Sequence, residues 1–246
     1  MFMREIEYHK TLNPKIWLPD GTMDRAVART LVAVAMDYVD YMHAIGFPID
    51  RTDVREIFVF GGIANYFYDK NSDIDVCILA DLTNIKKKLD GIDFFTFYKS
   101  LLHTWRRQFQ LSIRGLGIDL SLEDTNTPKN EPDWYRSGPS YSVITNTWIH
   151  APQRLSPETL REYRRRAKQI AQNIIREAHK IAANGGRLDE FVHLQQKLRD
   201  DSMRANYMQP ITPETMAFKM VRNTGLFIKL LRESSQRRAV KQFRVD

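Results

Sequence analysis

The sequence is short of cysteine and of long apolar runs, and each shortage excludes a class of protein. Cys77 is the single cysteine among 246 residues, which rules out an internal disulfide and any cysteine-rich zinc site. No apolar run approaches the roughly 20 residues that a membrane-spanning helix needs. The first five residues, Met-Phe-Met-Arg-Glu, do not begin a signal peptide. We therefore expect a cytoplasmic protein without a membrane partner.

The charge is unevenly distributed along a chain of otherwise ordinary composition. Hydrophobic residues make up 43% and charged residues 27%, as in soluble globular proteins. Residues 151–246 carry 20 Lys and Arg against 10 Asp and Glu, a net charge of +10, which leaves −3 for residues 1–150 of the overall +7. We expect two domains, residues 1–155 and residues 156–246, with the basic surface on the second.

Residues 57–79 carry the most informative pattern. Ile57–Phe60 and Val76–Leu79 are short apolar runs, which is typical of strands buried on both faces. Gly61 and Gly62 follow the first run, and the remaining length predicts about two helical turns between the strands. A glycine turn that leads into a helix lets a phosphate approach unpaired backbone N–H groups.

Two carboxylates open the second of these strands. Asp73 and Asp75 are two residues apart, so their side chains leave the sheet on the same face. Two carboxylates on one face can hold Mg²⁺ beside a bound phosphate. Each piece alone is weak, because Asp-x-Asp pairs are common in solvated turns and Gly-Gly is common in loops.

In this order and spacing, the glycine turn and the Asp73-Ile74-Asp75 segment resemble the DNA polymerase β-like nucleotidyltransferase superfamily. The resemblance covers about residues 55–125. It implies an α+β fold, with a small mixed sheet flanked by helices and followed by a C-terminal helical subdomain. Many members have Gly-Ser in the turn, where this chain has Gly61-Gly62, so one phosphate contact is missing.

The resemblance also requires a third carboxylate on a strand beside Asp73 and Asp75. Residues 117–122 supply Asp119, which alternates with Ile118 and Leu120 and would lie on the face opposite them. Glu123 and Asp124 follow and are reserve candidates.

The function implied by the resemblance is transfer of NMP from an NTP to a hydroxyl acceptor, with release of pyrophosphate. The carboxylates of Asp73, Asp75 and Asp119 would hold two Mg²⁺ ions, with Mn²⁺ as an alternative, and Asp119 would help remove the acceptor proton. Four residues would contact the nucleotide: Gly61, Gly62, Asn65 and Ser72.

The flanking segments are mostly helical. Apolar periodicity predicts helices over 24–45, from residue 93 through residue 109, from residue 157 to residue 183, over 188–203 and over 213–232, with a last edge strand at 141–145. The polar loop 126–138, which precedes this edge strand, carries Trp134, Tyr135 and Arg136, which could stack on a base. In the helix from residue 157, polar residues follow each other at intervals of four, three, four and four on one side: Arg161, Arg165, Lys168, Gln172 and Arg176. The four basic residues among them form one basic stripe.

This basic stripe, together with a basic tail (Arg237, Arg238, Lys241 and Arg244), predicts a nucleic acid acceptor, with RNA favoured. Two alternatives stay open. The acceptor can be a small molecule or a protein, which makes the basic half structural. Alternatively, the chain is a non-catalytic nucleic-acid-binding module with a degenerate site, for which Gly62 is the sole support.

A wider resemblance links the chain to short nucleotidyltransferase-like proteins of bacteriophages and large DNA viruses, which would place it in a host cytoplasm. It rests on scattered positions: Asn13-Pro14-Lys15, Ser72-Asp73-Ile74-Asp75, Gly138, Tyr141-Ser142, Trp148, Pro152, Phe218-Lys219, Arg222-Asn223 and Gly225.

Overall fold

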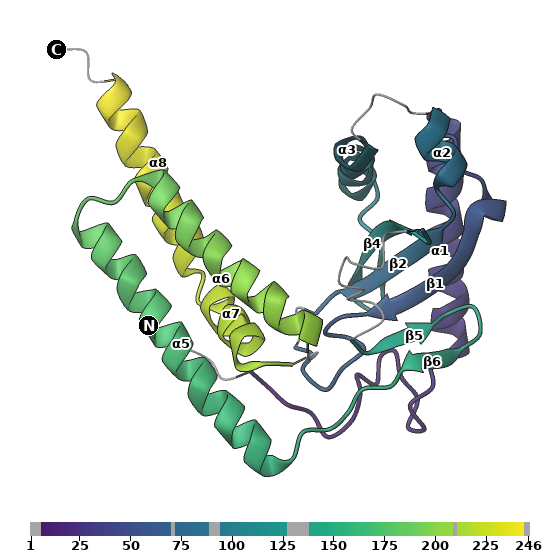
Figure 1. Cartoon of the computed structure of the whole chain (residues 1–246), viewed down its shortest axis with the longest axis horizontal. Helices are drawn as coiled ribbons and strands as arrows, with labels where there is room; N and C mark the ends of the chain where they lie inside the picture. The colour runs from purple at the N-terminus through teal and green to yellow at the C-terminus, as the bar shows by residue number, and fades with distance from the viewer. Residues whose placement is uncertain (1–5, 70–71, 89–93, 127–137, 209–210, 244–246) are drawn as a thin grey trace. The chain divides into compact units, whose positions relative to one another are not determined.

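A computed structural model describes residues 6–69, 72–88, 94–126, 138–208 and 211–243, without the side chains of residues 94–95, 203–208 and 237–243 (Figure 1). Residues 7–153 form one compact unit, and the chain from Arg154 onward, with Ile6, belongs to a second. The predicted functional division into residues 1–155 and 156–246 stays a prediction.

In its described residues, the first unit is built on a mixed six-stranded sheet with the order β3-β4-β2-β1-β5-β6. β2 runs antiparallel to β1 on one side and parallel to β4 on the other. The predicted α+β class is confirmed. The strands are β1 (Val54–Phe60), β2 (Ile74–Ala80), β3 (Ser112–Ile113), β4 (Leu116–Asp124), β5 (Ser140–Ser142) and β6 (Thr147–His150).

Helices cover one face of this sheet with a continuous apolar core. The helix α1 (Arg25–Ala44) agrees with the prediction for residues 24–45, and Asp24 caps it by accepting the N–H groups of Ala26 and Val27. Tyr38 of α1 meets Trp105 of α3 (Phe94–Gln108) with ring centroids 5.2 Å apart. The same buried cluster includes Val59, Val76 and Leu120 of the sheet. The short helix α2 (Thr83–Lys88) follows β2.

The helix α3 also supplies partners for the outer edge of β4. The strand β3 pairs with Leu116 and Gly117, so backbone groups further along the same edge of β4 need other partners. The backbone N–H of Leu122 donates to the hydroxyl of Tyr98, and Arg106 donates to the carbonyl of Leu120. Two polar side chains of α3 therefore pair with two backbone groups of this strand edge.

The prediction of a helix between β1 and β2 is wrong for the described part of this connection. The described residues 61–69 form turns, bends and irregular chain, and no helix occurs among them. Adjacent antiparallel strands need no crossover helix. The N-terminal arm takes up backbone groups of the turn, because Trp17 Nε1 donates to the carbonyl of Ile63 at 2.8 Å and His9 N–H donates to that of Tyr66 at 2.9 Å.

The prediction of an edge strand over residues 141–145 is wrong. The strand β5 ends at Ser142, residues 143–146 turn the chain, and β6 forms the edge instead. Asn146 adopts a φ of +56° in this turn, and its carbonyl accepts the Tyr141 hydroxyl at 2.7 Å. The loop residues Trp134, Tyr135 and Arg136 lie outside the described residues.

The second unit is helical, and two of its helices begin as predicted. Ser156 and Thr212 each accept a backbone N–H three residues ahead, with Pro at the next position. The predicted single helix 213–232 is wrong, because the chain breaks at Gly225, whose φ is +67°, and continues to residue 243. The helices are α5 (Pro157–Ala183), α6 (Leu188–Met208), α7 (Pro213–Asn223) and α8 (Leu226–Phe243).

Among the helices that the structure describes, none combines the length and the apolar composition needed to cross a lipid bilayer.

Candidate metal and nucleotide site

Three carboxylates meet where β1 ends and β2 begins. In the ladder, Asp75 pairs with Phe60 of β1 on one side and with Asp119 of β4 on the other. Paired residues of neighbouring strands point to the same face, so the Asp75 and Asp119 side chains lie side by side. Asp73 precedes Asp75 by two residues and joins them at the mouth of the strand. Asp119 lies on the strand beside Asp75, as predicted, and its carboxylate lies close to those of Asp73 and Asp75.

The geometry of this carboxylate triad suits a divalent cation. Each residue offers one oxygen, and these oxygens all lie within 4.8 Å of one another. Asp73 is exposed, whereas Asp75 and Asp119 are half-buried. Three carboxylates at this spacing repel each other unless a cation neutralises them, and ligands that are all oxygen suit Mg²⁺ and similar hard ions. The donor set present therefore fits the ion that the sequence predicts.

Gly61 is required for the position of Asp75. It adopts a φ of +74°, and a Cβ atom placed on it would lie 2.1 Å from Asp75 Oδ2. A side chain at this position would therefore displace the carboxylate as well as strain the backbone. The sequence predicted a glycine turn that lets a phosphate approach, and the structure adds that the turn also makes room for a metal ligand.

The other predicted nucleotide contacts lie in the connection between β1 and β2. Gly62 follows Gly61 in the same turn. Asn65 is buried, and its Oδ1 accepts the backbone N–H of Tyr66. Ser72 Oγ accepts the backbone N–H of Asp69 at 2.8 Å. The recorded hydrogen bonds of Asn65 and Ser72 are local turn contacts, and the predicted helix N-terminus is absent from the described part of this connection.

Arg106 is a residue of this site that the sequence reasoning missed. It comes from the last turn of α3, and its Nη2 forms an ion pair with Asp119 Oδ1. The pair is half-exposed, with 38% of the Arg106 side chain and 40% of the Asp119 side chain accessible. The one sequence signal is an arginine directly after the core residue Trp105, at the end of a helix that precedes the Asp119 strand.

The ion pair borders an open pocket of about 410 Å³. The pocket is lined by Asp73, by Asp119, and by residues at the end of α3 and in the segment that leads to β4. The latter include Arg106, Phe109, Gln110 and Ser112. A group bound in this pocket would therefore lie next to Asp119.

Burial raises the pKa of Asp119 above its ordinary value. The neighbouring charge of Asp73 acts in the same direction, whereas the charge of Arg106 and its hydrogen bond oppose it. The carboxylate is thus harder to ionise than a solvated aspartate, and a bound cation would relieve that cost.

The two reserve candidates lie at the other end of the strands. Glu123 pairs with Leu79 and Asp124 with Ala80, four and five rungs beyond the pairing of Asp75 with Asp119. Asp124 is buried and binds Lys86 Nζ at 2.7 Å. Although burial raises the pKa of Asp124, the hydrogen bond from Lys86 and those from backbone N–H groups hold it below the ordinary value. Asp124 therefore has a structural role at the start of α2.

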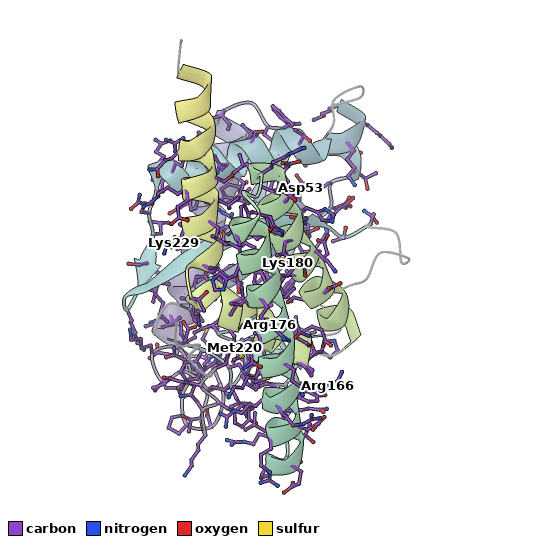
Figure 2. The ribbon with its side chains drawn as sticks, turned by 90° about the vertical axis from the view of Figure 1, so that its left-hand side faces the viewer. Asp53, Arg166, Arg176, Lys180, Met220 and Lys229 are labelled. Carbon is purple, nitrogen blue, oxygen red and sulfur yellow. The ribbon has the colours of Figure 1, made fainter. Side chains whose placement is uncertain are left out.

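The predicted basic stripe belongs to the second unit. Its four residues, Arg161, Arg165, Lys168 and Arg176, are exposed on α5, whereas alanines of the same helix are buried on another side. Figure 2 shows Arg166, Arg176 and Lys180 along this helix. Arg161 pairs with Glu158 at 3.2 Å and Arg165 with Glu162 at 2.8 Å. The side chains of the predicted basic tail lie outside the described residues.

Comparison with known proteins places the triad in a recognised domain. A family model described as "Nucleotidyltransferase domain" matches residues 49–140, which include β1, β2, β4 and all three carboxylates. No curated protein and no solved structure matches the chain. The resemblance to the polymerase β-like superfamily is confirmed, and the narrower resemblance to phage and viral proteins has no support from these comparisons.

Proposed function

We propose that this chain, whose residues 49–140 form a nucleotidyltransferase domain of the polymerase β-like superfamily, moves NMP from an NTP to a hydroxyl acceptor and releases pyrophosphate. The observation that carries the proposal is the convergence of Asp73, Asp75 and Asp119 within this domain. The ladder holds Asp75 and Asp119 in register, so the site is largely preorganised.

The triad would hold Mg²⁺, or Mn²⁺ in its place. When bound, the metal neutralises phosphate charge and makes the acceptor hydroxyl a stronger nucleophile. Asp73 and Asp75 would bind it at the nucleotide, with the backbone of the Gly61-Gly62 turn, Asn65 and Ser72 against the triphosphate. Asp119 would lie on the acceptor side, at the pocket, and take up the proton of the hydroxyl that attacks the α-phosphorus.

The acceptor that we propose is a nucleic acid, with single-stranded RNA favoured. The support is the separation of charge, with a net +10 on residues 151–246 and the basic stripe on an exposed side of α5. The glutamate partners of Arg161 and Arg165 do not remove this support, because ion pairs between exposed side chains are weak and a phosphate can replace the partner. A polyanion would gain from several such contacts at once.

The reaction is tested by transfer of label from α-labelled NTP in the presence of Mg²⁺. The substitutions Asp73→Ala and Asp75→Ala should each lower transfer by several orders of magnitude without unfolding the protein, because they remove ligands at a strand mouth and leave no buried cavity. Asp37→Ala, on the exposed side of α1, is the matched control and should transfer normally. Near wild-type transfer by either triad variant would refute the proposed function.

The acceptor is tested by the salt dependence of RNA binding. For a single strand, log K falls with log[salt] with a slope of about −0.7 for each phosphate contact. The double substitution Arg165→Glu and Lys168→Glu should flatten this slope and leave NTP affinity unchanged. The same change of charge at Lys197 and Arg199, two exposed residues of α6, should have a smaller effect.

An unaltered slope in the Arg165 and Lys168 variant would favour a protein or small-molecule acceptor. Failure of the wild-type protein to bind Mn²⁺ would favour the non-catalytic module.

A further inference from the structure

We propose that Arg106 exchanges partners during catalysis: it pairs with Asp119 in the metal-free protein and with a phosphate group of the acceptor once Asp119 holds a metal ion. This inference rests on the proposed function and names what the pocket beside Asp119 recognises. It makes Arg106 a specificity residue of the acceptor site.

The pairing of Arg106 with Asp119 is weak enough to be exchanged. Its shortest contact joins Nη2 to Oδ1, and Nη2 is shared with the carbonyl of Leu120, whereas the strong arginine–carboxylate arrangement gives two parallel hydrogen bonds to the carboxylate. Both partners are more than one-third exposed, so solvent screens the attraction. Arg106 Nε is buried and finds no hydrogen-bond partner among the described residues. A divalent ion carries twice the charge of the guanidinium group, and the carboxylates of Asp73 and Asp75 would bind it as well. It should therefore displace Arg106 from Asp119.

A hydrogen bond to the backbone would hold the guanidinium group of Arg106 at the site after Asp119 binds a metal ion. Its Nη2 also donates to the carbonyl of Leu120, on the outer edge of β4 beyond the residues that pair with β3. This bond does not depend on the charge of Asp119. Arg106 would therefore remain at the pocket wall with a positive charge that Asp119 no longer neutralises.

Arg106 is the one positively charged side chain in the described lining of the pocket. Besides Arg106, its described lining provides the polar side chains of Gln110 and Ser112, whereas Asp73 and Asp119 repel anions until a metal neutralises them. Arginine matches the geometry of phosphate through its planar fork of donors. A phosphate next to the acceptor hydroxyl is thus the group that Arg106 would bind, and a metal ion at Asp119 would favour that binding.

The first part of the test measures Mn²⁺ affinity without NTP or acceptor. Arg106→Gln should bind Mn²⁺ about two- to fivefold more tightly than wild type, since the ion no longer has to break a half-exposed ion pair. Arg107→Gln is the matched control: it removes the same charge from the next residue of α3, which is exposed, and should stay close to wild type. Equal affinities of the two variants would overturn the exchange.

The second part uses inorganic phosphate as the probe, in the absence of metal. Asp119→Asn removes the carboxylate charge, as a metal would, and should bind phosphate severalfold more tightly than wild type. Asp37→Asn makes the same charge change on α1 and should not. Adding Arg106→Gln to Asp119→Asn should abolish the gain, whereas adding Arg107→Gln should keep it.

Phosphate affinity that is the same with Arg106→Gln and with Arg107→Gln would overturn the proposal. If Arg106→Gln fails to fold because Leu120 loses its partner, the comparison of Asp119→Asn with Asp37→Asn decides, and equal phosphate affinities overturn it. Failure of the wild-type protein to bind Mn²⁺ would instead refute the proposed function, so the two failures are distinguishable.

Discussion

The substitution Gly61→Ala should remove a metal ligand without touching any carboxylate. A Cβ at this position would lie 2.1 Å from Asp75 Oδ2, whereas real Cβ contacts essentially never fall below 3.0 Å. The carboxylate must therefore move by about 0.9 Å, the difference between these two distances. Metal sites tolerate about 0.2 Å in ligand distance, so Asp75 would no longer ligate in its present position.

The expected loss in Mn²⁺ affinity is about 10- to 100-fold, the range found when a ligand loses its orientation. Alanine at a positive φ also costs about 1–2 kcal/mol of folding free energy, whatever the surroundings. Gly46→Ala separates the two effects, because Gly46 has a φ of +90° and nothing within 4 Å of the added Cβ. It should lower the melting temperature similarly and leave Mn²⁺ binding unchanged.

The assay is a Mn²⁺ titration followed by electron paramagnetic resonance, alongside thermal melting of both variants. If Gly61→Ala binds Mn²⁺ as tightly as Gly46→Ala, the Asp75 carboxylate does not ligate from the position next to Gly61.

Two further predictions follow from the pKa shifts. Because the pKa of Asp119 is raised, protons compete for this carboxylate at a higher pH than for an ordinary aspartate, so Mn²⁺ affinity should begin to fall at a higher pH. The Asp119→Asn variant should bind Mn²⁺ more weakly, and its affinity should depend less on pH. An unchanged pH profile of Mn²⁺ affinity would contradict the role of Asp119 as a metal ligand. Cys77 is fully buried, and burial raises the pKa of its thiol, so a thiol reagent should label it only at the rate of unfolding. Rapid labelling of the folded protein would show that β2 is not buried as described.

The metal ligands were predictable because their signal is local. The two-residue spacing of Asp73 and Asp75 fixes a common face, and the alternation around Asp119 fixes its face within its own strand. That Asp119 pairs with Asp75, rather than Glu123 doing so, depends on the register of two strands that are distant in sequence. No residue pattern within either strand determines that register.

Two of the errors, the predicted helix after Gly62 and the omission of Arg106, also arise from contacts between segments that are distant in sequence. The segment after Gly62 has the length for a helix, but the antiparallel order of β1 and β2 and the hydrogen bonds from Trp17 and His9 decide its conformation. Arg106 was missed because its roles depend on the contact between α3 and the edge of β4. The break at Gly225 was the one error with a local signal, since glycine often ends a helix.

The most direct test of the proposed function compares one NTP labelled on either the α- or the γ-phosphate, incubated with the protein, Mg²⁺ and single-stranded RNA. We predict that the α label appears in the RNA, that the γ label leaves as pyrophosphate, and that Asp75→Ala abolishes both changes. Appearance of the γ label in the acceptor, or release of the α label as free NMP without transfer, would contradict nucleotidyl transfer at the triad.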